Sequence, residues 1–236
     1  MQELELKRRD ALSGKAESIV MLLHGLGATG DDLAPLAEFF AENMPNTCFL
    51  LPDAPHAAPM AANGRQWFST PEMDGTSHIE RGVTMQESIA RVKQTLDREA
   101  AAASIPPERQ ILLGFSQGGM LSLEIAPRLE HRLCCVVSIA GMLLNAASLE
   151  NEVRARPPIL LCHDRMDNVV PFASLEAARE TLARLQFQVY TYTTKEAGHS
   201  IHPATIGCAV HFMLRELAGA TEENHMQENR EDGGDG

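Results

Sequence analysis

Short apolar runs alternate with amphipathic stretches along most of this chain. Runs such as Ile19–Leu23 and Cys48–Leu51 contain almost no polar residue, so both faces of each expected strand must be buried, as in a central parallel strand. Strands that alternate with helices predict an α/β protein with a mostly parallel sheet and helices on both faces. The other expected strands are Ile111–Leu113, Leu133–Ile139, Ile159–Cys162 and Gln188–Thr193, and the expected helices cover residues 33–40, 85–96, 120–126, 174–185 and 203–217.

The domain organisation follows from length and composition. A chain of 236 residues can form one well-buried domain, and we expect that domain over residues 1–218. From Gly219 the composition turns polar and glycine-rich, which predicts a disordered acidic tail over residues 219–236. Residues 53–78 lack periodicity and contain the only tryptophan, Trp67, so we expect a functional loop there.

Charge and cysteine usage exclude several classes of function. A net charge of −12 argues against nucleic acid or an anionic membrane as a main partner. The five cysteines are odd in number and most lie in apolar runs, which indicates buried thiols in a reducing compartment. We find neither a signal-peptide core nor a run that could span a bilayer, and expect a cytoplasmic protein without integral membrane association. The oligomeric state stays open, with a homodimer as one expectation.

The stretch Gly114–Gly118 reads Gly-Phe-Ser-Gln-Gly between an apolar strand and an apolar helix. In that context Gly-x-Ser-x-Gly is typical of a nucleophile elbow, a turn so tight that a Cβ at either flanking glycine would clash. The strained turn lifts the Ser116 hydroxyl out of the sheet. The alternative interpretation is an incidental serine in a glycine-rich turn, and the flanking strand and helix make it the less favoured one.

A second glycine motif points to a different function. Gly25-x-Gly27-x-x-Gly30 follows a strand and opens a helix, and Asp53 ends the next strand, as in a dinucleotide-binding oxidoreductase. In hydrolases of this architecture, however, a His-Gly turn after an early strand supplies one amide of the oxyanion hole. We prefer the second interpretation, with the Leu26 amide as one donor and the Gln117 amide as the other.

A serine nucleophile needs a histidine as its base and an acid that orients the histidine. The acid is expected after a late strand, where Asp164 and Asp167 compete, and we prefer Asp167 because its turn can swing the carboxylate back to the site. Asp164 is interpreted as a capping or turn residue, and His163 as a structural histidine bonded to backbone.

The base is expected after the last strand, where Gly198 frees the backbone before His199. His202 is interpreted as a solvated or capping residue at the start of the final helix. The His-x-x-His spacing of this pair could suggest a metal, but no third ligand follows at a suitable spacing, so we expect neither a metal nor a cofactor.

Five motifs in this order resemble the phospholipase/carboxylesterase family, which comprises small serine hydrolases of the α/β-hydrolase fold related to acyl-protein thioesterases. They are His24–Asp32, Arg65–Phe68, Gly114–Gly119, Asp167–Pro171 and Gly198–His199.

The resemblance runs from about residue 19 to residue 217. It implies a triad of Ser116, Asp167 and His199 with Leu26 and Gln117 amides as the oxyanion hole, in agreement with the interpretation of the residues themselves. The chain departs from the usual family pattern around the acid, at residues 163–165 and 168.

Substrate-lining residues are expected on loops at the carboxyl ends of the strands. We predict Leu26, Trp67, Phe68, Met142 and Met166 in that role. With no large lid insertion, the expected reaction is hydrolysis of a small ester with a short or medium acyl chain through an acyl-enzyme intermediate. Thioesters, lysophospholipids, peptides and lactones stay open as substrates, since a triad does not dictate the leaving group. A binding protein without catalysis is disfavoured because all three triad residues are present.

Overall fold

The computed structural model describes the backbone of residues 3–231 and the side chains of residues 3–220. Its centre is a seven-stranded sheet with the strand order β1-β3-β2-β6-β7-β8-β9. All neighbouring strands are parallel except β1, which pairs antiparallel with β3 at one edge. The mostly parallel sheet predicted from the sequence is therefore confirmed. The strands are β1 (Leu6–Arg9), β2 (Ser18–Leu23), β3 (Thr47–Pro52), β6 (Gln110–Phe115), β7 (Cys135–Ile139), β8 (Ile159–Asp164) and β9 (Val189–Thr194).

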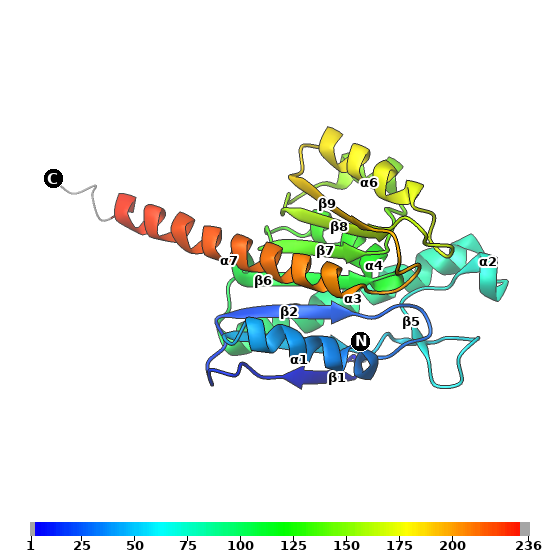
Figure 1. The fold of residues 1–236 in the computed structure, drawn as a ribbon, viewed down its shortest axis with the longest axis horizontal. Coiled ribbons are helices and arrows are strands. Elements are labelled where there is room, and N and C mark those ends of the chain that lie inside the picture. Colours follow the sequence, from blue (N-terminus) through cyan, green and yellow to red (C-terminus); the bar gives the residue numbers. More distant parts are fainter. Residues whose placement is uncertain (1–2, 232–236) are drawn as a thin grey trace.

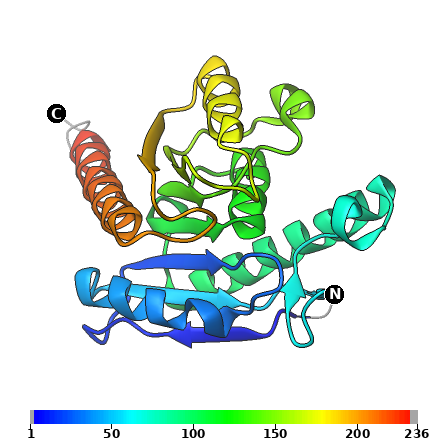
Figure 2. The ribbon, with the colours of Figure 1, turned by 45° about the vertical axis from the view of Figure 1, so that its right-hand side comes forward.

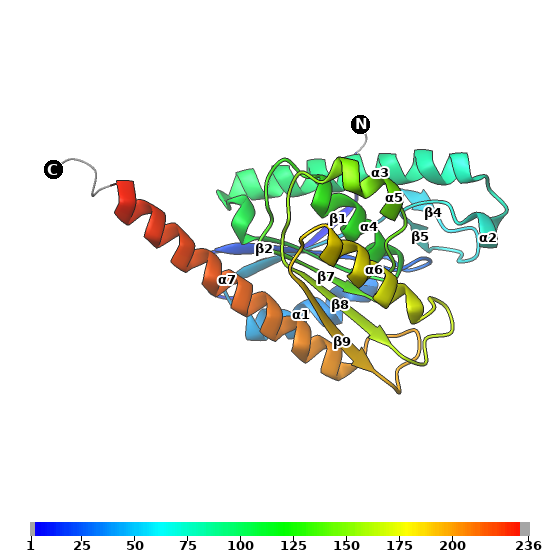
Figure 3. The same cartoon turned by 90° about the horizontal axis from the view of Figure 1, so that it is seen from above.

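Helices cover both faces of this sheet, as Figures 1 and 3 show. Helices α1 (Ala34–Asn43) and α7 (Pro203–Glu231) lie on one face, and α3 (His78–Ala103), α4 (Gln117–Ile125), α5 (Ala146–Glu152) and α6 (Ala173–Arg184) lie on the other. Short 3₁₀ helices, η1 (Gly30–Leu33), η2 (Pro107–Arg109) and η3 (Ala126–Arg128), join neighbouring elements.

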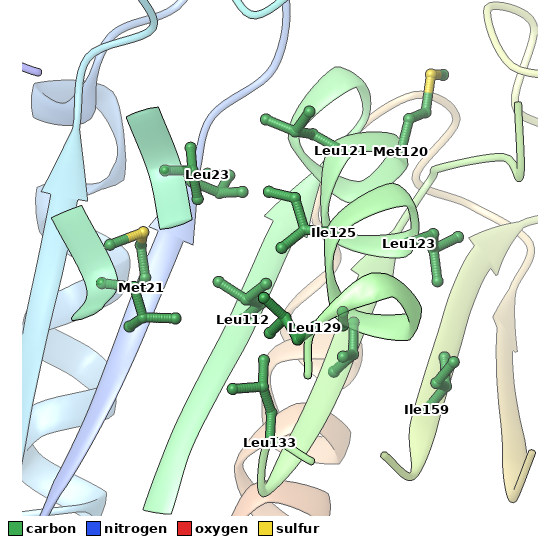
Figure 4. Packing of buried hydrophobic residues seen from close by; sticks show 14 of the residues in the cluster. Met21, Leu23, Leu112, Met120, Leu121, Leu123, Ile125, Leu129, Leu133 and Ile159 are labelled. Atoms are coloured by element: carbon green, nitrogen blue, oxygen red, sulfur yellow. The ribbon is translucent and has the colours of Figure 1, made fainter. Parts of the chain in front are cut away.

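Each face has its own hydrophobic core because successive residues of a strand point to opposite sides. Val20 and Leu22 of β2 pack with Phe40 of α1 and Met213 of α7. The alternate residue Met21 belongs to the other core, with α3, α4 and α6. Figure 4 shows side chains of α4 over the central strands, in a cluster that includes Met21, Leu23, Leu112, Leu121, Ile125 and Ile159.

The carboxyl ends of the parallel strands lie together along one end of the sheet, where further short elements are added. The segment between β3 and α3, predicted as a long loop, contains a two-stranded sheet of β4 (His56–Ala57) and β5 (Arg65–Gln66) and the short helix α2 (Pro71–Asp74). Helix α2 and the first part of α3 extend beyond the sheet (Figure 2). This end of the sheet carries the site described below.

Three further elements differ from the sequence prediction. The edge strand β1 and the helix α5 were not predicted, because β1 is a charged four-residue run and α5 is too short for a clear period. Helix α7 continues to Glu231 and so includes residues assigned to the acidic tail. The rest of that predicted tail, residues 232–236, lies outside the described residues.

Candidate active site

Ser116 sits in a strained turn between β6 and α4. Its backbone has φ 52° and ψ −117°, a conformation that costs an L-residue about 1–3 kcal/mol and persists only when the surroundings impose it. A Cβ on Gly114 would collide with the backbone of Gly118, and a Cβ on Gly118 would collide with the carbonyl of Leu23. Both glycines are therefore required by the close approach of α4 to the ends of β6 and β2.

The histidine and the acid predicted from the sequence lie in one hydrogen-bonded series with this serine. His199 Nε2 lies 2.9 Å from Ser116 Oγ, and His199 Nδ1 lies 2.8 Å from Asp167 Oδ2. His199 follows Gly198, whose φ of 59° is readily available only to glycine. Since an ionised carboxylate only accepts, Nδ1 carries the proton and Nε2 is left to accept from the serine hydroxyl.

The environment of Asp167 keeps its carboxylate ionised. Burial of the side chain opposes the charge, but hydrogen bonds from His199 and from the Val169 and Val170 amides outweigh it and hold the pKa of Asp167 below its usual value. Both amides donate to Oδ1 at 2.9 Å. His163 Nε2 donates to the Val170 carbonyl at 2.9 Å and lies 3.3 Å from Asp167 Oδ2, so the predicted structural histidine also borders the acid.

The competing acid Asp164 has a different position. Its Oδ2 accepts from the Thr194 hydroxyl and from the Glu196 and Ala197 amides, and its Oδ1 accepts from the Met166 amide. Burial raises the pKa of Asp164, but these donors together lower it well below its usual range. Asp164 therefore joins the loop that carries Asp167 to the loop that carries His199, which agrees with the interpretation as a turn residue.

His202, the competing base, caps the final helix. Its Nδ1 accepts from the Ala204 amide at 3.1 Å, in the first turn of α7. Among the described residues, the structure has no group of three His, Cys, Asp or Glu side chains that could hold a metal ion.

The residues predicted as oxyanion donors border the same site. The amides of Leu26 and Gln117 have no hydrogen-bond partner within the described part of the chain, and both residues line the cavity that contains Ser116. The turn before Leu26 is held by His24, whose Nδ1 donates to the Gly25 carbonyl at 2.8 Å and whose Nε2 accepts from the Ala54 amide at 3.1 Å. Burial lowers the pKa of His24 and so favours this neutral form.

The acid of the alternative dinucleotide motif is engaged within the protein. Asp53 Oδ1 accepts from the Gly30 amide at 2.6 Å, at the start of η1. A Cβ on Gly30 would collide with the carbonyl of Leu51, so this glycine allows η1 to pack closely on β3. The third glycine and the acid of the motif thus have a structural explanation that involves no ribose.

A cavity of about 540 Å³ opens beside Ser116 and His199. Three of the predicted lining residues are part of its wall: Leu26, Phe68 and Met142. The sequence prediction missed most of the remaining apolar lining, although Phe115 and Met120 flank the elbow and could have been found from that position. The further lining residues are Thr70, Glu72, Met73, Arg81, Leu144, Val169 and Val170.

Trp67 and Met166 do not line this cavity, contrary to the sequence prediction. Trp67 is fully buried: its amide donates to Gln117 Oε1 at 2.7 Å and its indole Nε1 donates to the His24 carbonyl at 2.9 Å. Met166 is 67% exposed and does not belong to the cavity wall. Trp67 therefore joins Gln117 to the turn at His24, a supporting role that a sequence pattern could not distinguish from a substrate contact.

Comparisons with known proteins find relatives over most of this chain. The model of the family described as Phospholipase/Carboxylesterase matches residues 10–215. A probable carboxylesterase from Oryza sativa subsp. japonica is 30% identical over 91% of this chain and 84% of its own length. Acyl-protein thioesterase 1 from Saccharomyces cerevisiae is 27% identical over 86% of this chain and 94% of its own length.

Two solved structures extend the likeness to the fold. Esterase PE8 has a TM-score of 0.85 and 31% identity, covering 92% of this chain and 100% of that structure. SOBER1 from Arabidopsis thaliana has a TM-score of 0.75 and 25% identity, covering 86% of this chain and 100% of that structure.

Proposed function

The chain belongs to the phospholipase/carboxylesterase family, a family of carboxylic ester hydrolases, and from that premise we propose that it is a serine carboxylesterase acting on esters with short or medium acyl chains. The single observation that carries the proposal is the bonded series from Ser116 through His199 to Asp167 at the mouth of an apolar cavity. Among the described residues, no helix is both long and apolar enough to cross a membrane.

In the proposed reaction, the Ser116 hydroxyl attacks the ester carbonyl while His199 Nε2 accepts its proton. Asp167 holds the Nδ1–H tautomer and stabilises the imidazolium that forms. The carbonyl oxygen becomes an oxyanion, which the Leu26 and Gln117 amides bind; one such donor is worth roughly 3 kcal/mol of barrier. The collapse of this intermediate expels the alcohol, which takes the proton from His199. Water then releases the acid by the same steps in reverse order.

The hydrogen bonds around Gln117 support its role as a preorganised donor. Its side-chain oxygen accepts from the Trp67 amide and its side-chain nitrogen donates to the Phe68 carbonyl, each at 2.7 Å. Both ends of the carboxamide are thus fixed, and the residue that carries the proposed amide donor is held in place at the cavity wall. Preorganised donors accelerate acyl transfer because they need no rearrangement when the charge develops.

The size and lining of the cavity support the expected substrate class. A volume of about 540 Å³ lies in the lower half of the usual range for small-molecule sites. Its wall is mainly apolar, with Phe68, Met120, Met142 and Leu144 available to pack against an acyl chain. The charged pair Glu72 and Arg81 also belongs to the wall, 3.8 Å apart.

A thioester is the second candidate for the bond that is cleaved. The observation that favours it is the similarity to acyl-protein thioesterase 1 of S. cerevisiae. The triad and the oxyanion donors would act identically on a thioester, since only the leaving atom changes. The expected homodimer and the cytoplasmic location stay predictions.

Hydrolysis of p-nitrophenyl esters and matched acyl thioesters of graded chain length tests the proposal. We expect turnover that a fluorophosphonate abolishes by labelling Ser116, and a loss of at least about 10³-fold in kcat for Ser116→Ala. An unchanged melting temperature of Ser116→Ala would show that the fold survives. Retention of most esterase activity by Ser116→Ala would refute the assignment.

A further inference from the structure

A further buried carboxylate lies on the helix that follows the nucleophile, and the proposed reaction does not use it. Glu124 belongs to α4, the helix that begins at Gln117 beside the nucleophile, and is 1% exposed. A carboxylate that is removed from water is stable only when hydrogen bonds and opposite charges compensate for the lost hydration. The partners of Glu124 therefore indicate what it holds in place.

Both carboxylate oxygens of Glu124 bind one residue, Asn145. Oε1 accepts from the Asn145 main-chain amide at 3.0 Å, and Oε2 accepts from the Asn145 side-chain nitrogen, also at 3.0 Å. A residue that is bonded through its main chain and its side chain can neither shift nor rotate freely. Asn145 precedes α5 but makes no side-chain cap to that helix, so its amide group serves Glu124 instead.

Arg128 neutralises the buried charge. Its Nη1 lies 2.9 Å from Glu124 Oε2, and its Nε donates to Glu152 Oε2 on α5 at 2.6 Å. The carboxylate of Glu124 thus has three donors, which together satisfy most of its acceptor capacity. Helices α4 and α5, which lie on the same face of the sheet in Figure 3, are joined by this cluster.

The segment that ends at Asn145 forms part of the wall of the active-site cavity. Its first residues are fixed to the sheet, because the Ala140 amide donates to the Cys162 carbonyl at 2.8 Å and a Cβ on Gly141 would collide with Ser138 Oγ. Met142 and Leu144 lie between this end and Asn145, and both line the cavity. Glu124 is thus the anchor at the far end of a short wall segment.

We propose that Glu124 is a positioning residue that sets acyl-chain selectivity by holding the Met142–Leu144 wall against the substrate cavity. The inference rests on the proposed esterase function and names a specificity determinant of the same site. The anchor lies on the helix that begins directly after the nucleophile, so the wall keeps a constant distance from the acyl-enzyme bond. A longer acyl chain reaches this wall and gains from its packing, whereas an acetyl group does not.

The variant Glu124→Gln tests the proposal with little change in shape. Glutamine offers one acceptor oxygen to the two donors of Asn145 and places its own amide against the other, so one hydrogen bond is lost and the wall loosens. We expect the ratio of kcat/KM for p-nitrophenyl hexanoate over acetate to fall by about tenfold, mainly through KM of the hexanoate. Asn145→Ala should lower the ratio similarly, and the double variant should add little to either change.

Glu150→Gln is the matched control, because Glu150 is an exposed glutamate on α5; it should leave the ratio as in the unmodified protein. A lower melting temperature of Glu124→Gln with an unchanged ratio would overturn the proposal and leave Glu124 a purely structural role. Should Glu124→Gln not fold, Asn145→Ala decides by the same criterion. An unmodified protein that hydrolyses neither ester would overturn the proposed function and this inference together, whereas active protein with unchanged ratios would overturn this inference alone.

Discussion

Replacement of Asp167 by asparagine is the most direct test of how the acid acts. The oxygen at the Oδ1 position is required there, because it accepts from the Val169 and Val170 amides. In Asp167→Asn the side-chain oxygen therefore stays with these two donors, and the NH₂ group takes the Oδ2 position, which faces His199 Nδ1 at 2.8 Å. A donor at that position forces Nδ1 to accept, so Nε2 carries the proton and can no longer accept from Ser116.

The size of the effect follows from this change of tautomer. The hydrogen bond between Ser116 and His199 reverses its direction, and the reaction loses its base while the positions of the atoms hardly change. We expect kcat to fall by about 10⁴-fold, the scale at which a triad with the wrong imidazole tautomer loses turnover, which corresponds to about 5 kcal/mol of barrier. His163 adds to the effect, since its Nε2–H also lies 3.3 Å from the Oδ2 position and would then face a second donor.

The assay is hydrolysis of p-nitrophenyl butyrate, with the melting temperature as a measure of folding. Asp97→Asn is the matched control, since Asp97 is an exposed aspartate on α3, and it should keep the rate of the unmodified protein. A folded Asp167→Asn variant that retains more than about a tenth of the normal kcat would refute the tautomer argument. A larger loss in Asp164→Asn than in Asp167→Asn would transfer the role of the acid to Asp164.

Three further predictions concern stability and the support of the site. Asp164 has a depressed pKa in the folded protein, so its contribution to the free energy of unfolding is present above the unfolded pKa of about 3.9 and is lost as the pH falls through the lower folded value. Asp164→Asn should therefore lower the free energy of unfolding by roughly 2 kcal/mol at pH 7 and by less near pH 3, as measured by urea titration. Gly118→Ala should destabilise the protein by about 3 kcal/mol or prevent folding, because the added methyl collides with the backbone of β2; a normal melting temperature would contradict the strained elbow. Trp67→Phe removes the donor to the His24 carbonyl and should lower kcat by about tenfold with little change in KM. Phe68→Ala, by contrast, should mainly raise KM. The opposite pattern would show that Trp67 contacts the substrate.

The elements that could be predicted from the sequence are those that a local sequence pattern determines. A parallel strand that is buried on both faces must be almost purely apolar, so β2, β3 and β6 were found from composition alone. The elbow could also be predicted, because a serine at positive φ requires flanking glycines, and residue order alone then directed the search for the acid and the base to two late loops.

The edge strand β1 shows where local pattern stops being informative. Its residues, Leu-Lys-Arg-Arg, read as a polar terminus, and only its pairing with β3, from Leu6 opposite Pro52 to Arg9 opposite Phe49, makes it a strand. Edge strands have one solvated side, so charged residues are compatible with them. The partner strand β3, whose pairing decides between a strand and an irregular segment here, lies too far along the chain to be part of any local sequence pattern.

The same limit explains why the supporting roles of Trp67 and Glu124 could not be predicted from the sequence. A lone tryptophan on a loop near a candidate site has the same sequence appearance whether it contacts substrate or supports the loop. The two hydrogen bonds that decide the question are donated by Trp67 to Gln117 and His24, which lie far from it in the sequence. A glutamate within an apolar helix has no local reason to be buried, and its reason lies in Asn145, beyond a whole strand. Catalytic roles require particular residue types in a particular order and can therefore be predicted from the sequence. Supporting roles require only a suitable partner at the right distance in the fold. The residues that tune selectivity in this chain therefore belong to the class that only the assembled fold can reveal.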